Sequence, residues 1–200
     1  MNVKSILGVA AWASVLIVLT IPDALAHKLH MRGQPIAVAE SSLTVTPSRD
    51  WNQLRTRIGK KTETWTLDGA VLNDVTFFGG IEPGNPLVRE RNKKREPLPK
   101  FTRTTLLAEV PELLERTYRA YKHSGSFQVT AVEPIRFLEN DAVLFSFEFA
   151  DEDQLTRRGE ARAAIINGKL YMMTFEAPRL NYFGKLIADF RQLADSATLK

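Results

Sequence analysis

The stretch AVLFSFEFADEDQLTRRGEARAAIINGKLYMMTFE, residues 142–176, contains the clearest structural signals in the chain. Large apolar residues occupy every second position of its first part: Val143, Phe145, Phe147 and Phe149. Because successive side chains of a strand point to opposite faces of a sheet, this alternation predicts a strand over 142–150 with one buried face. Two further predicted strands, 156–166 and 169–176, flank Asn167-Gly168, a dipeptide that favours a tight hairpin turn. The stretch therefore predicts an antiparallel meander.

Weaker signals earlier in the chain predict four more strands. They cover 42–46, 62–67, 71–78 and 127–138. The first is expected to end at Pro47, because proline cannot donate a ladder hydrogen bond. Asp68-Gly69 is expected to join the second and third in a hairpin. Trp51 and Leu54 lie between the first two strands and predict a short turn or helix with apolar anchors.

Two segments have the spacing of amphipathic helices. The first begins at about Pro111, where the missing N–H of proline costs nothing, and ends at Ser124-Gly125. The second covers Leu180–Ala197 and places Phe190 on its apolar stripe. Because the strands come in hairpins and the helices are segregated from them, we predict the α+β class, with a largely antiparallel sheet flanked by helices.

Residues 1–26 have the layout of a cleavable secretory signal, with a positive start, an uncharged run and the tripeptide Ala24-Leu25-Ala26. Cleavage after Ala26 makes His27 the first residue of the mature chain. The alternative is an uncleaved N-terminal anchor, because the apolar run is only slightly shorter than a membrane-spanning helix. No later segment approaches membrane length. We therefore expect a protein exported to the periplasm of a bacterial envelope, with a mature domain that does not span the membrane.

Residues 27–41 lack periodicity and contain Gly33 and Pro35, so they are predicted to form a flexible tether. The remaining residues, 42–200, are enough for one α+β domain and too few for two independent cores.

The order of the predicted elements resembles that of the PsbP-like superfamily, which also includes Mog-like proteins. The resemblance rests on an early strand that ends in proline and leads to a tryptophan (Pro47, Trp51), then hairpins, a central helix, a meander and a closing helix after 171–176. It covers about Ser42–Ala197 and brings no site motif that transfers to particular residues. It implies an α/β/α sandwich and a binding or assembly role.

The composition excludes several classes of function. The chain has no cysteine, which excludes a disulfide framework, a thiolate metal site and a cysteine nucleophile. It also lacks a nucleophile elbow, a phosphate-binding glycine loop, a zinc-protease motif and a dinucleotide fingerprint. We therefore expect a non-catalytic protein without a cofactor. The alternative is a small envelope enzyme with an unrecognised carboxylate or histidine site, which requires two or more of these residues to share a concave pocket: Asp74, His123, Glu148 and Glu160.

The expected mature terminus contains a candidate metal site. A free α-amine and an imidazole at His27, with a second imidazole at His30, are nitrogen ligands of the kind that copper binds tightly. Two histidines in a polar tail are also typical of a segment with no metal function.

The segment from Gly79 to Arg103 contains four prolines and three glycines and predicts a long loop. Its second part concentrates positive charge: Arg89, Arg91, Lys93, Lys94, Arg95, Lys100 and Arg103. Such a segment is either a solvated loop or a contact for an anionic partner, which is an envelope protein or an anionic envelope surface. Binding to nucleic acid would need stacking aromatic residues, of which only Phe101 is nearby, and export separates the protein from nucleic acid. We therefore expect no nucleic-acid partner.

Overall fold

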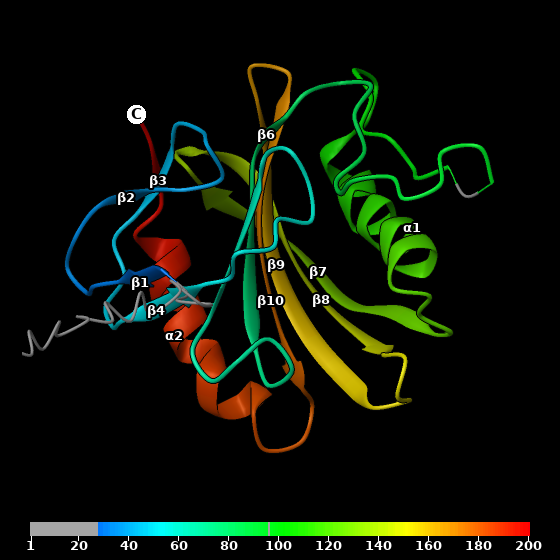
Figure 1. Ribbon diagram of the computed structural model, residues 1–200. Helices are drawn as coiled ribbons and strands as arrows, with labels where there is room; N and C mark the ends of the chain where they lie inside the picture. Colours follow the sequence, from blue (N-terminus) through cyan, green and yellow to red (C-terminus); the bar gives the residue numbers. More distant parts are fainter. Residues whose placement is uncertain (1–27, 96) are drawn as a thin grey trace, which may run out of the picture.

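The computed structural model describes residues 28–95 and 97–200. A large sheet runs through the centre of the fold, with the strand order β1-β4-β5-β6-β10-β9-β8-β7 (Figure 1). Its strands are β1 (Lys28–His30), β4 (Trp51–Gln53), β5 (Thr62–Thr66), β6 (Asp74–Ile81), β7 (Phe127–Phe137), β8 (Asn140–Ala150), β9 (Thr156–Ile166) and β10 (Lys169–Pro178). A small sheet has the order β11-β3-β2 and consists of β2 (Ile36–Ala37), β3 (Leu43–Val45) and β11 (Thr198–Leu199). All pairings between neighbouring strands are antiparallel.

The helices α1 (Val110–Tyr121) and α2 (Phe183–Asp195) lie on opposite sides of the large sheet, and a short 3-10 turn, η1 (Leu107–Glu109), precedes α1 (Figure 1). Strand β10 shows how one strand serves both layers. Met172 packs in the core under α1, whereas Met173 and Phe175 pack in the core under α2. This alternation produces an α/β/α sandwich, so the predicted fold class is confirmed.

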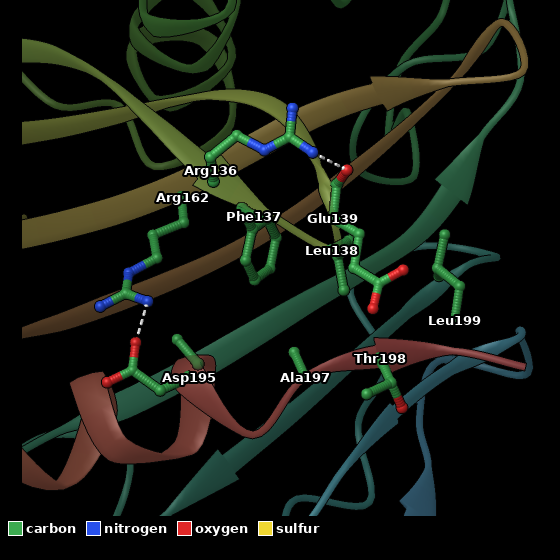
Figure 2. Close-up of a pocket in the computed structure, with 10 residues that line it drawn as sticks. Arg136, Phe137, Leu138, Glu139, Arg162, Asp195, Ala197, Thr198 and Leu199 are labelled. Atoms are coloured by element: carbon green, nitrogen blue, oxygen red, sulfur yellow. Dashed lines mark hydrogen bonds and ion pairs between the residues drawn. The ribbon is translucent and has the colours of Figure 1, made fainter.

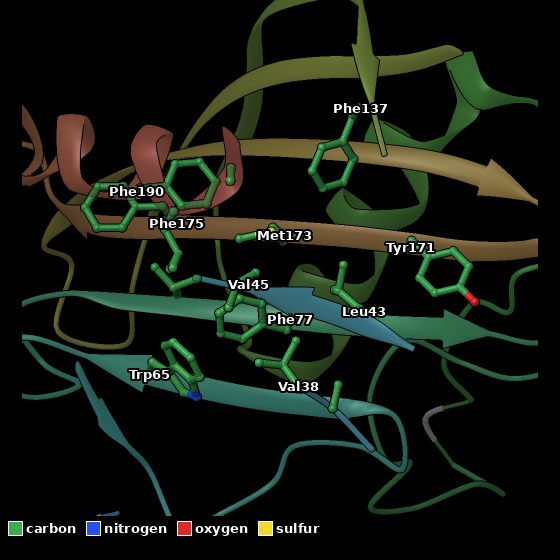
Figure 3. Packing of buried hydrophobic residues seen from close by; sticks show 14 of the residues in the cluster. Val38, Leu43, Val45, Trp65, Phe77, Phe137, Tyr171, Met173, Phe175 and Phe190 are labelled. Atoms are coloured by element: carbon green, nitrogen blue, oxygen red, sulfur yellow. The ribbon is translucent and has the colours of Figure 1, made fainter. Parts of the chain in front are cut away.

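The core under α2 also contains the small sheet (Figure 3). The ring of Phe190 stacks on that of Phe175, with a distance of 5.6 Å between ring centres. Val45 of β3 and Trp65 of β5 are fully buried in the same cluster. The closing helix and the first strands therefore share one core, although they are far apart in sequence.

The core under α1 is aromatic. Phe145, Phe147 and Phe149 of β8 all lie on this side, as their alternation predicts, and Tyr118 of α1 packs edge-on against the last two. A Cβ atom at Gly159 of β9 would lie only 2.2 Å from Cζ of Phe147. The glycine therefore makes room for the ring on the neighbouring strand.

The two predicted hairpin turns are present in different forms. Asn167 and Gly168 both have positive φ angles, 51° and 71°, and join β9 to β10 directly. Gly69 also has a positive φ of 101°, but β5 and β6 are joined through the wider connection 67–73.

Three short segments differ from the sequence predictions. Residues 28–41, predicted to be a tether, supply β1 and β2 and bury Val38 and Ala39 completely. Trp51 begins strand β4 rather than a turn or helix, and β6 extends through Gly79 to Ile81, which were expected to be loop. Strands β1, β2 and β4 have only two or three residues, too few to show a periodicity of two, which is why the pattern missed them.

None of the helices in the described part of the chain is long and apolar enough to cross a membrane. The predicted secretory signal, residues 1–26, and its cleavage site before His27 lie outside the described residues and stay predictions.

Candidate functional site

The positively charged segment lies in the long connection between β6 and η1, residues 82–106, which we call the basic loop. Two anchors hold it against the core under α1: Leu87 and Val88 on the first side, Leu98 and Phe101 on the second, all buried. The backbone N–H of Gly84 donates to the carbonyl of Phe101 at 2.7 Å, so the two anchored sides are also tied to each other. The loop is therefore irregular in structure but fixed at its base.

Between the anchors, residues 89–95 form a tip that projects beside α1 (Figure 1). It carries five of the seven predicted contact residues: Arg89, Arg91, Lys93, Lys94 and Arg95. The other two, Lys100 and Arg103, follow the second anchor. All seven side chains are exposed, and none forms an ion pair with another residue in the part of the chain that the structure describes.

One contact orients the tip. The guanidinium carbon of Arg91 lies 4.7 Å from the centre of the Tyr121 ring at the end of α1. A cation over an aromatic face is attracted by the ring, so this residue fixes the tip relative to the helix.

A pocket of about 470 Å³ lies beside the tip and adds charges that the sequence analysis did not single out. Lys60 and Lys61, from the turn before β5, line it together with Arg89. Glu82 also lines it, but its carboxylate accepts a hydrogen bond from Lys169 at 3.0 Å, which holds the pKa of Glu82 below its usual value. Lys61 lies 28 residues before Arg89, and no local sequence pattern indicates that the Lys60–Lys61 pair and Arg89 are close. Their proximity arises only from the fold.

The structure separates the four side chains proposed for an enzymatic site. Glu148 pairs with Arg179 at 3.4 Å, and Glu160 pairs with Arg191 of α2 at 2.6 Å. Asp74 lies on the α1 side of the sheet with Phe78 of the same strand, and His123 is exposed beyond the end of α1. These four residues therefore do not share a pocket.

Asp74 instead belongs to a buried polar cluster between the sheet and α1. It is the cross-strand partner of Glu176, whose side chain is only 2% exposed. Lys122 donates to Glu176, the hydroxyl of Tyr118 lies 3.5 Å from the same carboxylate, and Arg157 lies 3.9 Å from Asp74. Only Asp74 could be singled out from sequence, because the other members come from α1 and the residue after it, from β9 and from β10.

Burial, and then the negative charge of Glu176, raise the pKa of Asp74 from 3.8 to about 7. The cluster is largely buried and joins the end of α1 to the sheet, so we interpret it as a structural network with a proton-dependent member.

His30 is part of the domain rather than of a free tail. Its ring stacks on Trp65 at 4.3 Å between ring centres, and Nε2 lies 3.0 Å from the side-chain oxygen of Gln53. Burial lowers the pKa of this imidazole. A copper site with His27, which lies outside the described residues, would have to compete with these contacts. Among residues 28–95 and 97–200, no three His, Asp or Glu side chains gather in a group that would hold a metal ion.

A second pocket, of about 640 Å³, lies between the β7–β8 turn and the C-terminal end of α2 (Figure 2). Arg162 donates to Asp195 at 2.5 Å, and Arg136 donates to the carbonyl of Glu139 and pairs with Asp141. Because both arginines already have partners, this pocket has no excess charge to select an anionic ligand.

No family model matches the chain, and no curated protein matches it in sequence. Solved structures do match. Cyanobacterial PsbP (CyanoP) from Synechocystis sp. PCC 6803 is 11% identical with a TM-score of 0.55, and the match covers 90% of this chain and 96% of that chain. The chain has the PsbP-like fold. A Bacteroides thetaiotaomicron VPI-5482 protein is 9% identical with a TM-score of 0.50, covering 85% of this chain and 49% of that one.

The yeast Ran-binding protein Mog1p, from Saccharomyces cerevisiae, is 7% identical with a TM-score of 0.47, and the match covers 85% of this chain and 96% of that chain. The match to cyanobacterial PsbP confirms, at the level of the fold, the resemblance stated from the order of elements. Structural matches at about 10% sequence identity show the fold alone. The function therefore has to be argued from the surface of this chain.

Proposed function

We propose that this protein is an exported, non-catalytic accessory of the bacterial envelope that binds an anionic lipid surface through the basic loop. The observation that carries the proposal is the combination of a fixed base with an exposed, positively charged tip at residues 89–95. A loop that only solubilised the domain would not need four buried apolar anchors. The separation of Asp74, Glu148 and Glu160 supports the binding function over the enzymatic alternative.

The charge of the tip suits a surface more than a small ligand. Arg89 lines the pocket beside the tip, whereas the exposed side chains of Lys93, Lys94 and Arg95 do not. Cations near an anionic bilayer contribute up to about 1 kcal/mol each, and the attraction falls off within a Debye length of about 8 Å at physiological salt. Several of them together produce binding that is reversible and sensitive to salt.

Changing Lys93, Lys94 and Arg95 to serine is expected to reduce binding to anionic vesicles roughly a hundredfold at low ionic strength, because three contributions of about 1 kcal/mol are lost. The melting temperature is expected to stay nearly unchanged, since all three side chains are exposed. Sedimentation with vesicles of phosphatidylglycerol and phosphatidylcholine, compared with phosphatidylcholine alone, measures the effect.

A matched control is the triple change of Lys28, Lys185 and Lys200 to serine, which removes the same charge from exposed positions away from the loop. This variant is expected to sediment like the unaltered protein. Equal, negligible sedimentation of all three proteins would contradict the proposal, as would an equal loss in the control. Stability lost by the loop variant would show that its cations are paired within the structure.

Export has its own test. The Ala24-Leu25-Ala26 tripeptide predicts that protein recovered from cells begins at His27. Intact-mass measurement is expected to show the loss of residues 1–26. Full-length protein retained in the membrane fraction would replace the cleaved signal with an uncleaved anchor.

A further inference from the structure

A diffuse electrostatic contact requires only exposed charge, whereas the pocket beside the tip has a defined lining of charged and apolar residues. Its positive side chains come from two segments, the turn 58–61 and the start of the basic loop. Apolar residues complete the lining: Ile81, Pro86 and Val88. The pocket therefore combines cations at its rim with an apolar part.

The two segments are locked to each other. The backbone N–H of Arg89 donates to the carbonyl of Ile58 at 2.6 Å. At Gly59, a Cβ atom would lie 3.0 Å from the carbonyl oxygen of Leu87, so the turn packs directly on the loop backbone. Thr62, which is fully buried, closes the turn by accepting the N–H of Gly59 at 2.7 Å and donating to its carbonyl at 3.1 Å. The cations at the rim are thus held on a rigid frame before any ligand binds.

The charge balance favours an anion with more than one negative charge. Lys60, Lys61 and Arg89 face one carboxylate, Glu82, which is already paired with Lys169. Lys61 donates to the carbonyl of Glu40 at 2.5 Å, which orients its ammonium group and leaves two further N–H donors. A guanidinium and two ammonium groups match the several oxygens of a phosphate better than the two oxygens of a carboxylate.

We propose that this pocket binds the phosphomonoester of a lipid headgroup, while the tip of the basic loop contacts the surrounding anionic surface. The inference rests on the proposed membrane contact and adds a specific ligand to it. A phosphomonoester carries between one and two negative charges at neutral pH, more than the phosphodiester of other anionic lipids. A volume of about 470 Å³ exceeds that of the phosphate group alone and leaves room for the neighbouring part of the headgroup.

The test compares vesicles that contain phosphatidic acid with vesicles that contain phosphatidylglycerol at equal total surface charge, in about 150 mM salt, where diffuse attraction is screened. The unaltered protein is expected to prefer phosphatidic acid about tenfold, the effect of one added charge-assisted hydrogen bond. The K60S/K61S variant is expected to lose this preference. The K185S/K200S variant, with the same loss of charge elsewhere, is expected to keep it.

Competition with inorganic phosphate tests whether the pocket binds a lipid headgroup or a free phosphate ion. We expect millimolar phosphate to leave the preference for phosphatidic acid in place, and displacement by phosphate at that concentration would overturn the lipid assignment. Equal binding of the two vesicle types by the unaltered protein would contradict the proposed phosphomonoester pocket but would leave the proposed membrane contact standing. Binding to neither, at low salt as well, would overturn both. Unchanged melting temperatures of the variants are the check that the exposed lysines have been removed without loss of fold.

Discussion

Replacing Phe190 with alanine is expected to lower the free energy of unfolding by about 3 to 5 kcal/mol, the range for removing a large aromatic side chain from a core. Phe190 is fully buried, and its ring stacks on that of Phe175 in the middle of the large sheet. The cavity would open where α2 and the sheet meet the small sheet, which contains Val45. Phe190, Phe175 and Val45 belong to one core cluster, so α2, the large sheet and the small sheet all contribute to the core that this substitution disrupts.

Urea denaturation followed by tryptophan fluorescence measures the effect, because Trp51 and Trp65 are buried in the same core. Lys185→Ala is the control on the same helix: its side chain is exposed, and we expect a change within about 0.5 kcal/mol. A midpoint for the Phe190 variant equal to that of the unaltered protein would contradict the packing of α2 on the sheet.

Sequence pattern predicts those strands and helices that are long enough to repeat their hydrophobic periodicity. The alternation over 142–150 and the Asn167-Gly168 turn locate β8, β9 and β10, and the amphipathic spacing locates both helices. Residues 28–41 have no such pattern, because what holds them is tertiary. The backbone N–H of Ala39 donates to the buried carboxylate of Glu63 at 3.1 Å, and His30 stacks on Trp65. Contacts of this kind join residues that are more than 20 positions apart and leave no local signal.

The same distinction between local pattern and tertiary contact applies to the candidate site. The cations of the basic loop are adjacent in sequence, so composition alone finds them. The Lys60–Lys61 pair becomes part of the site only because the N–H of Arg89 bonds to Ile58 in the turn beside it. The alternation along β6 likewise allows either facing for Asp74, and only the pairing of β6 with β10 places it beside Glu176. Local pattern therefore indicates which residues carry charge, and topology decides which charges meet.

Replacing Asp74 with asparagine is expected to stabilise the protein, and to do so more strongly at pH 8 than at pH 5. Burial and Glu176 raise the pKa of Asp74 to about 7 in the folded chain, against 3.8 for an unperturbed aspartate. The folded state therefore binds a proton that the unfolded state releases between these values, so the contribution of Asp74 to stability falls as the pH rises from about 4 to about 7. Asparagine resembles the protonated carboxyl group and stays neutral throughout.

The difference between the two pKa values corresponds to a change on the order of 4 kcal/mol, an upper bound because Arg157 and Lys122 can adjust to the charged form. Urea denaturation of both proteins at pH 5 and pH 8 measures the part of this change that develops above pH 5, at most about 3 kcal/mol, and subtracting the two pH dependences removes the titration of all other groups. Asp153→Asn, at an exposed aspartate, is the matched control and is expected to leave the pH dependence unchanged. If Asp74→Asn destabilises the protein equally at both pH values, Asp74 is ionised in the folded state and its pairing with Arg157 outweighs its burial and the repulsion of Glu176. Stabilisation that grows from pH 5 to about pH 7 and is constant above it means instead that the protonated form of Asp74 is the one that the buried cluster accommodates.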